Sequence, residues 1–216
     1  VVSSTINTAT RIYDRTLLAV FKENRKVLKE MVRDSNKLFE DARIRKYNIM
    51  PTLRRLQQCD IDTGHFYVQV TDYLSEVTKA LIHITRPSLE HIDNNHEGMS
   101  KEQIVDLMRV NDQVEAIFDK INDMLASKDF SDLDLVLEMR DKLFDTIVGA
   151  IKSQLRRING NPSGSTRASV LYLTILNETK TMMLQSRNLL KSQHYFLEAQ
   201  NNADTPSCRQ STQTLL

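Results

Sequence analysis

The 216-residue chain is poor in the residues that turn or interrupt secondary structure, with only 5 Gly and 4 Pro. A β-sandwich or a doubly wound α/β fold needs more tight turns than this composition supplies, so it favours an all-α fold with long helices. The only two cysteines, Cys59 and Cys208, are too few for a disulfide framework. Reduced thiols in the cytosol are the simplest interpretation.

Neither sign of charge is in excess, because 29 Lys and Arg stand against 28 Asp and Glu, a formal net charge of +1. A general binder of nucleic acid or acidic membranes needs a positive surplus, so no nucleic-acid partner is expected. The longest uncharged stretches, 1–10 and 168–177, are far shorter than the ~20 apolar residues that span a bilayer. We therefore expect no transmembrane span and no signal peptide. The chain starts at Val1 rather than Met, so we expect a fragment of a longer protein.

Apolar residues recur at the i, i+3, i+4, i+7 spacing of amphipathic helices. The predicted helices span 4–58, 63–94, 101–127, 132–159 and 165–200. Asn24 or Pro51 is expected to divide the first, Pro87 to kink the second, and Ser100 with Gln103 to form a capping box. The predicted buried stripes are Val70, Tyr73, Leu74, Val77, Leu81 and Ile84; Ile104, Leu107, Met108, Val114, Phe118, Ile121 and Leu125; and Leu133, Val136, Leu137, Leu143, Phe144, Ile147, Ile151 and Leu155.

Short segments of the first half recur in the same order in the second half. The three pairs are LRRLQ at 53–57 with LRRIN at 155–159, KLFE at 37–40 with KLFD at 142–145, and YL at 73–74 with YL at 172–173. Two copies of one helical unit would give this shared order. The predicted domains are a first three-helix repeat over 1–98, a second over 99–200, and a polar tail over 201–216. Each repeat has an apolar strip to cover, so the two should pack as antiparallel bundles around one elongated core.

Three segments carry a resemblance to the PhoU family: 64–74 (GHFYVQVTDYL), 91–96 (HIDNNH) and 155–158 (LRRI). The resemblance covers about 5–197 and is closest to the PhoU-like segment of bacterial inorganic phosphate transporters. It implies a PhoU-like, elongated antiparallel helical bundle. It also implies a cytoplasmic regulatory domain at the inner face of the cell membrane, which modulates phosphate uptake through a permease on the same or a separate chain.

The PhoU family carries an acidic pair, Glu/Asp-x-x-x-Asp, just after each Tyr-Leu. Here Ser75 and Lys79 fill the first pair of positions, and Thr174 and Glu178 fill the second. One carboxylate remains of four, so we expect no cofactor. A regulator that binds a divalent metal is the alternative hypothesis.

Carboxylates four residues apart share one helix face, where they can hold a cation together. A charged face in contact with solvent is the competing interpretation. The candidate metal residues, with Glu178, are Asp134, Glu138, Asp141 and Asp145 as the first cluster and Asp72 with Glu76 as the second.

Two further groups are candidates for contact with a partner or with phosphate. His91, Asp93 and His96 lie in an expected connection between helices, where they can bind zinc, cap a helix or touch a transporter. The second group is Arg54, Arg55, Arg156 and Arg157. These arginines either oppose the dipole at helix C-termini or bind phosphate or lipid head groups in a bidentate way.

No motif for a catalytic nucleophile, a phosphate-cradling glycine loop or a paired-cysteine metal site occurs in the sequence. We therefore expect a protein that acts by contact and is not an enzyme. A generic helical scaffold or a signalling homodimer is the remaining alternative.

Overall fold

The computed structural model describes residues 1–57, 61–160 and 165–202, with side chains described for 1–54, 63–160 and 165–199. Over these ranges the chain forms seven helices and no strand, which confirms the predicted all-α class. Nowhere in them does a helix combine the length and apolar character needed to cross a bilayer. The two cysteines, and the predicted tail apart from residues 201 and 202, lie outside the described residues.

Helix boundaries follow the predicted stops closely in the second half of the chain. The helices are α1 (Val2–Phe21), α2 (Arg25–Tyr47), α3 (Met50–Gln57), α4 (Ile61–Asp93), α5 (Lys101–Ser127), α6 (Leu133–Gly160) and α7 (Thr166–Asn202). Ser100 and Gln103 form the predicted capping box, and Asn24 caps α2 by accepting from the amide of Val27 at 3.1 Å. The segment predicted over 4–58 is broken twice, because Pro51 also falls in the first turn of a separate helix, α3.

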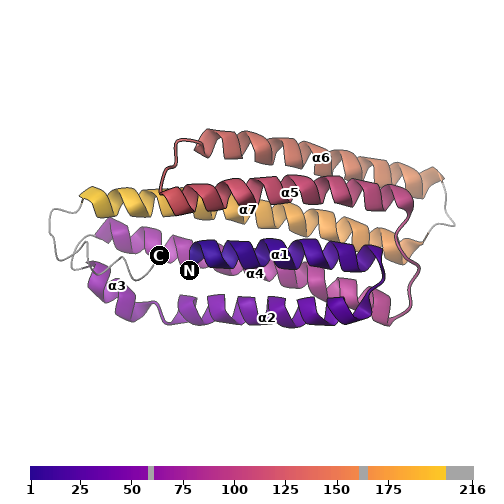
Figure 1. Ribbon diagram of the computed structural model, residues 1–216, viewed down its shortest axis with the longest axis horizontal. Coiled ribbons are helices and arrows are strands. Elements are labelled where there is room, and N and C mark those ends of the chain that lie inside the picture. The colour runs from indigo at the N-terminus through magenta and orange to yellow at the C-terminus, as the bar shows by residue number, and fades with distance from the viewer. Residues whose placement is uncertain (58–60, 161–164, 203–216) are drawn as a thin grey trace.

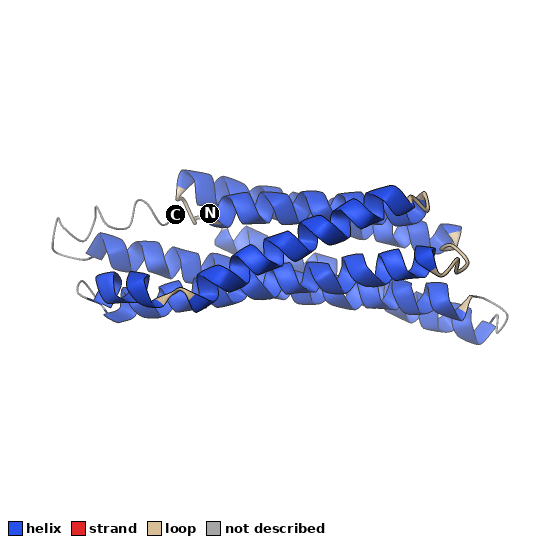
Figure 2. Ribbon diagram, turned by 90° about the horizontal axis from the view of Figure 1, so that it is seen from below, coloured by secondary structure: helices blue, strands red, loops and turns tan. Residues whose placement is uncertain are grey.

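The helices run along one long axis and form an elongated bundle (Figure 1). Helices α1, α4, α5 and α7 form its centre, while α2 and α6 lie at opposite edges. The most extensive packing joins α4 to α7, and the view turned by 90° shows the same elongated shape (Figure 2). The predicted boundary at 98/99 falls in the connection between α4 and α5. The division into two repeats stays a prediction.

Buried hydroxyls on α7 are satisfied by their own helix. Thr179 Oγ1 donates to the Ile175 carbonyl at 2.7 Å, and Ser186 Oγ donates to the Met182 carbonyl at 2.8 Å. These bonds remove the cost of burying an unpaired hydroxyl, so the helix tolerates small polar residues at the centre of the bundle.

Two residues predicted on buried stripes are exposed, Met108 by 48% and Leu155 by 50%. Their neighbours Leu107 and Gln154 occupy the inward positions, and a step of one residue turns a side chain by about 100° around the helix. The predicted burial of Met108 and Leu155 was therefore wrong.

Candidate functional site

Asp72 and Glu76, the two candidate metal residues on α4, each already have a lysine as an ion-pair partner. Asp72 Oδ1 lies 3.2 Å from Lys46 Nζ, and Glu76 Oε2 lies 3.7 Å from Lys79 Nζ. All four side chains are partly exposed, so both pairs are surface ion pairs that stabilise the fold by at most about 1 kcal/mol each.

The corresponding stretch of α7 offers one carboxylate, Glu178, whose Oε2 lies 3.3 Å from His83 Nδ1. Ser75 has a neutral hydroxyl and is buried, and Lys79 has a positive charge, so neither replaces a missing carboxylate. Across the described ranges, no three His, Cys, Asp or Glu side chains converge in the geometry of a metal site. These positions do not fit the family's multi-carboxylate metal cluster.

The first predicted cluster, Asp134, Glu138, Asp141 and Asp145, lies on the exposed face of α6. Asp141 Oδ1 accepts from Arg140 Nη2 at 2.6 Å, within the same helix. The other three carboxylates have no hydrogen bond or ion pair with a described residue. The arrangement is that of a charged helix face in contact with solvent.

His91 is buried, with 5% of its surface exposed, and its Nε2 donates to the Glu97 carbonyl at 2.8 Å. The His96 ring lies against it, with the ring centroids 5.3 Å apart. The hydrogen bond fixes the connection between α4 and α5 against the end of α4. His91 therefore has a structural role that does not need a metal.

The rest of this predicted loop is a helix cap. Asn95 has a φ of 52°, and the amides of Asn95 and His96 donate to carbonyl oxygens of the last turn of α4. This pattern is the Schellman motif, in which Asn tolerates the left-handed position. Asp93 forms an ion pair with Arg25 at the start of α2. The geometry agrees with the capping interpretation of His91, Asp93 and His96.

The four predicted arginines occupy different environments. Arg54 on α3 and Arg156 on α6 are exposed, Arg157 is half-buried, and the side chain of Arg55 lies outside the described residues. The recurring Leu-Arg-Arg segment thus ends a short separate helix in the first half and a long continuous one in the second.

Arg157 belongs to a polar cluster that joins α5, α6 and α7. Its Nη2 lies 3.2 Å from Asp106 Oδ2, and its Nε donates to Gln154 Oε1 at 2.9 Å. The Tyr172 hydroxyl donates to the same Asp106 oxygen at 2.9 Å. Burial, and then the bond to Asp106, raise the pKa of Tyr172 above its usual value. The guanidinium of Arg157 is held internally, which leaves Arg156 as the outward-facing member of the pair.

Buried amides extend this cluster toward a cleft that sequence reasoning did not predict. Gln103 Nε2 donates to Gln154 Oε1 at 3.2 Å, and Gln154 Nε2 donates to Ser169 Oγ at 2.9 Å. All three line a cleft of about 720 Å³ beside the N-termini of α5 and α7. The polar groups of these three side chains bond to one another, so none of the three presents an unpaired group to the cleft. The capping box marked Gln103, but nothing in the sequence marked Gln154 or Ser169.

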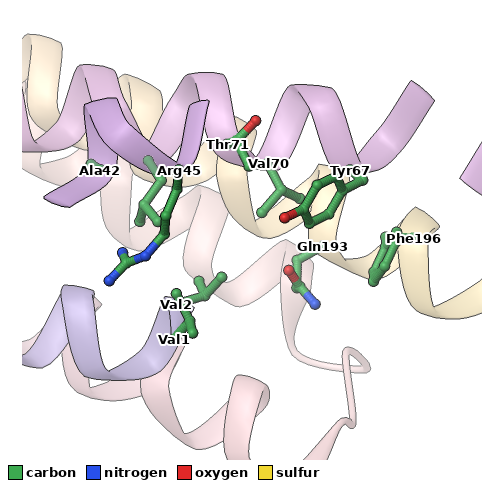
Figure 3. Close-up of a pocket in the computed structure, with 10 residues that line it drawn as sticks. Val1, Val2, Ala42, Arg45, Tyr67, Val70, Thr71, Gln193 and Phe196 are labelled. Carbon is green, nitrogen blue, oxygen red and sulfur yellow. The ribbon is translucent and has the colours of Figure 1, made fainter. Parts of the chain in front are cut away.

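A smaller pocket of about 180 Å³ lies where α1, α2, α4 and α7 meet (Figure 3). Val70, Leu74 and Phe196 give it apolar walls, and Arg45 lies on the opposite side from Gln193. Gln193 is only 2% exposed, and its Oε1 has no hydrogen-bond partner among the described residues. The volume is below the roughly 300–1,000 Å³ of typical small-molecule sites. The pocket has room for a small apolar group but contains no catalytic arrangement.

Comparisons with known proteins show a close likeness in fold and a low identity in sequence. No protein-family model matches the chain, and no curated protein sequence matches it. The structure of PhoU from Pseudomonas aeruginosa is similar, with a TM-score of 0.75 at 11% identity over 91% of this chain and 93% of that one. The phosphate transport system regulatory protein PhoU from Streptococcus pneumoniae gives a TM-score of 0.73 at 11% identity, over 91% of each chain. The chain therefore has a PhoU-like fold, which confirms the predicted architecture.

Proposed function

We propose that this protein is a non-enzymatic regulator of phosphate transport that works by contact with the transport machinery. The observation that carries the proposal is the likeness to two PhoU structures over nine-tenths of this chain and of theirs. One of the two is named as a phosphate transport system regulatory protein. Agreement over nine-tenths of each chain supports a shared mode of action better than one matching subdomain would.

The described side chains agree with action by contact. Several charged groups form surface ion pairs, helix caps and the Asp106–Arg157–Tyr172 cluster, and the carboxylates of Glu76 and Glu178 already have basic partners. We therefore leave metal dependence out of the proposal. A contact regulator changes transport by binding one conformation of its partner more tightly than another.

The partner we propose is the membrane domain of an inorganic phosphate permease, on the same or a separate chain, contacted at the cytoplasmic face of the membrane. Arg54 and Arg156 are exposed and suit contact with phosphate or with lipid head groups. Their role as contact residues stays a prediction.

Co-purification tests this partner. The tagged chain is expressed in its own organism under scarce and abundant phosphate, and the detergent-solubilised membranes are searched for a phosphate permease. We expect enrichment of the permease over a tagged helical protein of similar size, and a different enrichment in the two conditions. Arg54→Glu should reduce it, whereas Arg33→Glu, at a position 77% exposed on α2, should not. Absence of the permease in both conditions would contradict the proposed partner.

A further inference from the structure

The pocket where α1, α2, α4 and α7 meet has a largely apolar wall. Val70, Leu74 and Phe196 line it, and all three side chains are buried. Thr71 is also part of the wall, but its Oγ1 donates to the Val68 carbonyl at 2.8 Å and needs no other partner. The pocket has a volume of about 180 Å³, and an apolar cavity of roughly 150 Å³ accepts a benzene ring. The pocket therefore fits an apolar body about the size of a six-membered ring.

One buried amide in this wall has no partner. Gln193 on α7 is 2% exposed, and neither end of its amide bonds to a described residue. Gln103 and Gln154 are buried to a similar degree, yet both are hydrogen-bonded at each end of the amide. Burying an unpaired amide is unfavourable, and a polar group of a ligand would remove this cost. Gln193 thus marks one side of the pocket as a place for a hydroxyl or another small polar group.

The opposite side of the pocket carries a cation. Arg45 on α2 lies across from Gln193 (Figure 3). It forms no ion pair or hydrogen bond with a described residue, whereas Arg43 on the same helix binds Glu40 at 2.9 Å. Among the described residues that line the pocket, Arg45 has the only charged side chain, and no carboxylate faces it there. A guanidinium can bind both oxygens of one carboxylate, so this side suits an anion.

We propose that this pocket binds a small carboxylate that carries a hydroxyl at the far end of a compact apolar body. The carboxylate lies at Arg45, the apolar body lies between Val70, Leu74 and Phe196, and the hydroxyl bonds to the Gln193 amide. The inference rests on the placement of two unpaired polar groups on opposite sides of an apolar pocket.

The same wall argues against other small ligands. Inorganic phosphate has no apolar body to fill the space between the buried side chains, and a cation would meet Arg45 with no carboxylate to hold it. The inference is therefore independent of the proposed role in phosphate transport, because phosphate is not expected to bind in this pocket.

Isothermal titration calorimetry on the whole chain tests the site with 4-hydroxybenzoate as the probe. We expect it to bind about tenfold more tightly than 4-hydroxybenzamide, which has the same shape without the charge. We also expect it to bind more tightly than benzoate, which lacks the hydroxyl. Inorganic phosphate should not displace it.

Two variants assign the two ends of the ligand. Arg45→Gln should remove the preference for the carboxylate over the amide, whereas Arg33→Gln, at a position 77% exposed on the same helix, should keep it. Gln193→Leu should remove the preference for 4-hydroxybenzoate over benzoate. It should also raise the temperature of unfolding, because it replaces an unpaired buried amide by an apolar group of similar size.

Circular dichroism should show that the variants keep the helical fold, and Arg45→Gln changes an exposed side chain that the fold does not need. No saturable binding of 4-hydroxybenzoate at millimolar concentration would overturn the proposal. Equal affinity for 4-hydroxybenzoate and 4-hydroxybenzamide in the wild type, an unchanged preference in Arg45→Gln, or displacement by inorganic phosphate would overturn it as well.

Discussion

Helices α6 and α7 are neighbours in the chain, yet they differ in how much of their surface is buried. On α6, five buried residues form one stripe, and the opposite face carries exposed charge. On α7, buried residues come in adjacent pairs, such as Ile175 with Leu176 and Met182 with Met183, which cover a wide arc of the helix. Position in the bundle explains the contrast, because α7 is packed on several sides by α4, α5 and α6, whereas α6 lies at the edge.

The largest expected effect of a single substitution is at the centre. Leu176→Ala removes a fully buried side chain on α7 and should lower the free energy of unfolding by about 2–5 kcal/mol. Val148→Ala, on the exposed face of α6, should change it by less than about 0.5 kcal/mol. Urea denaturation followed by circular dichroism measures both. Equal effects would mean that centre and edge do not differ as described.

A buried hydrogen bond joins α1 to α7 at the centre of the bundle. The hydroxyls of Tyr13 and Thr179 lie 2.8 Å apart, and Thr179 donates to the Ile175 carbonyl, so Tyr13 is the donor. Tyr13→Phe should cost about 1 kcal/mol of stability at neutral pH.

Burial raises the pKa of Tyr13, so the folded state holds this proton longer than the unfolded state does. The contribution of Tyr13 to the free energy of unfolding is fully present below pH 10.0, the normal tyrosine pKa, and it decreases as the pH rises above that value. The wild type should therefore lose its advantage over Tyr13→Phe above that pH. A constant difference at all pH values would contradict a buried neutral hydroxyl.

At the edge, a substitution at Gly149 should have the opposite sign. The added methyl group meets no neighbour, and alanine is a better helix former, so Gly149→Ala should stabilise the folded chain by about 0.5–1 kcal/mol. The measurement is thermal unfolding at low protein concentration, where self-association does not contribute. Destabilisation would show that this face is packed against another part of the chain.

The smallest expected effect concerns Glu115 on α5. Burial first, and then the nearby charges of Asp14, Asp112 and Asp119, raise the pKa of Glu115. Because the raised pKa disfavours the charged form in the folded state, the penalty is present at neutral pH and disappears as the pH falls below the normal range of a glutamate. Glu115→Gln should therefore stabilise the chain by about 0.2–0.5 kcal/mol at pH 7 and have no such effect in acid. Chemical unfolding at several pH values would show it, and a gain that is equal in acid would contradict it.

Local features of the sequence predicted the helices well where a stripe and a cap coincide. For α5, the Ser100 and Gln103 capping box and the apolar stripe together set the start of the helix where the structure has it. The apolar stripe alone wrongly predicted that Leu155 is buried. On a helix at the edge of the bundle, an exposed residue can have the same i, i+4 spacing as the buried residues. The first 58 residues have few turn residues, so the second break, before α3, was harder to place.

The side-chain clusters depend on contacts between distant segments, which a single sequence does not reveal. For Arg157 the sequence left open a role at the helix dipole or in contact with a partner or phosphate, because nothing local identifies Asp106, 51 residues away, as its partner. For His91 the sequence suggested a connection rich in capping residues, and its partner Glu97 lies in that connection, six residues along the chain. Features within one connection are visible in a single sequence, whereas contacts between packed helices are not.

The most direct test of the central claim is phosphate uptake by the source organism. Uptake of radiolabelled phosphate is compared between the wild type and a strain that lacks the coding segment for residues 1–216, under scarce and abundant phosphate. If the chain regulates phosphate transport, the deletion should change how uptake responds to phosphate supply. If it acts on a separate permease, the intact chain supplied separately should restore that response. Identical uptake by the two strains in both conditions would contradict the account.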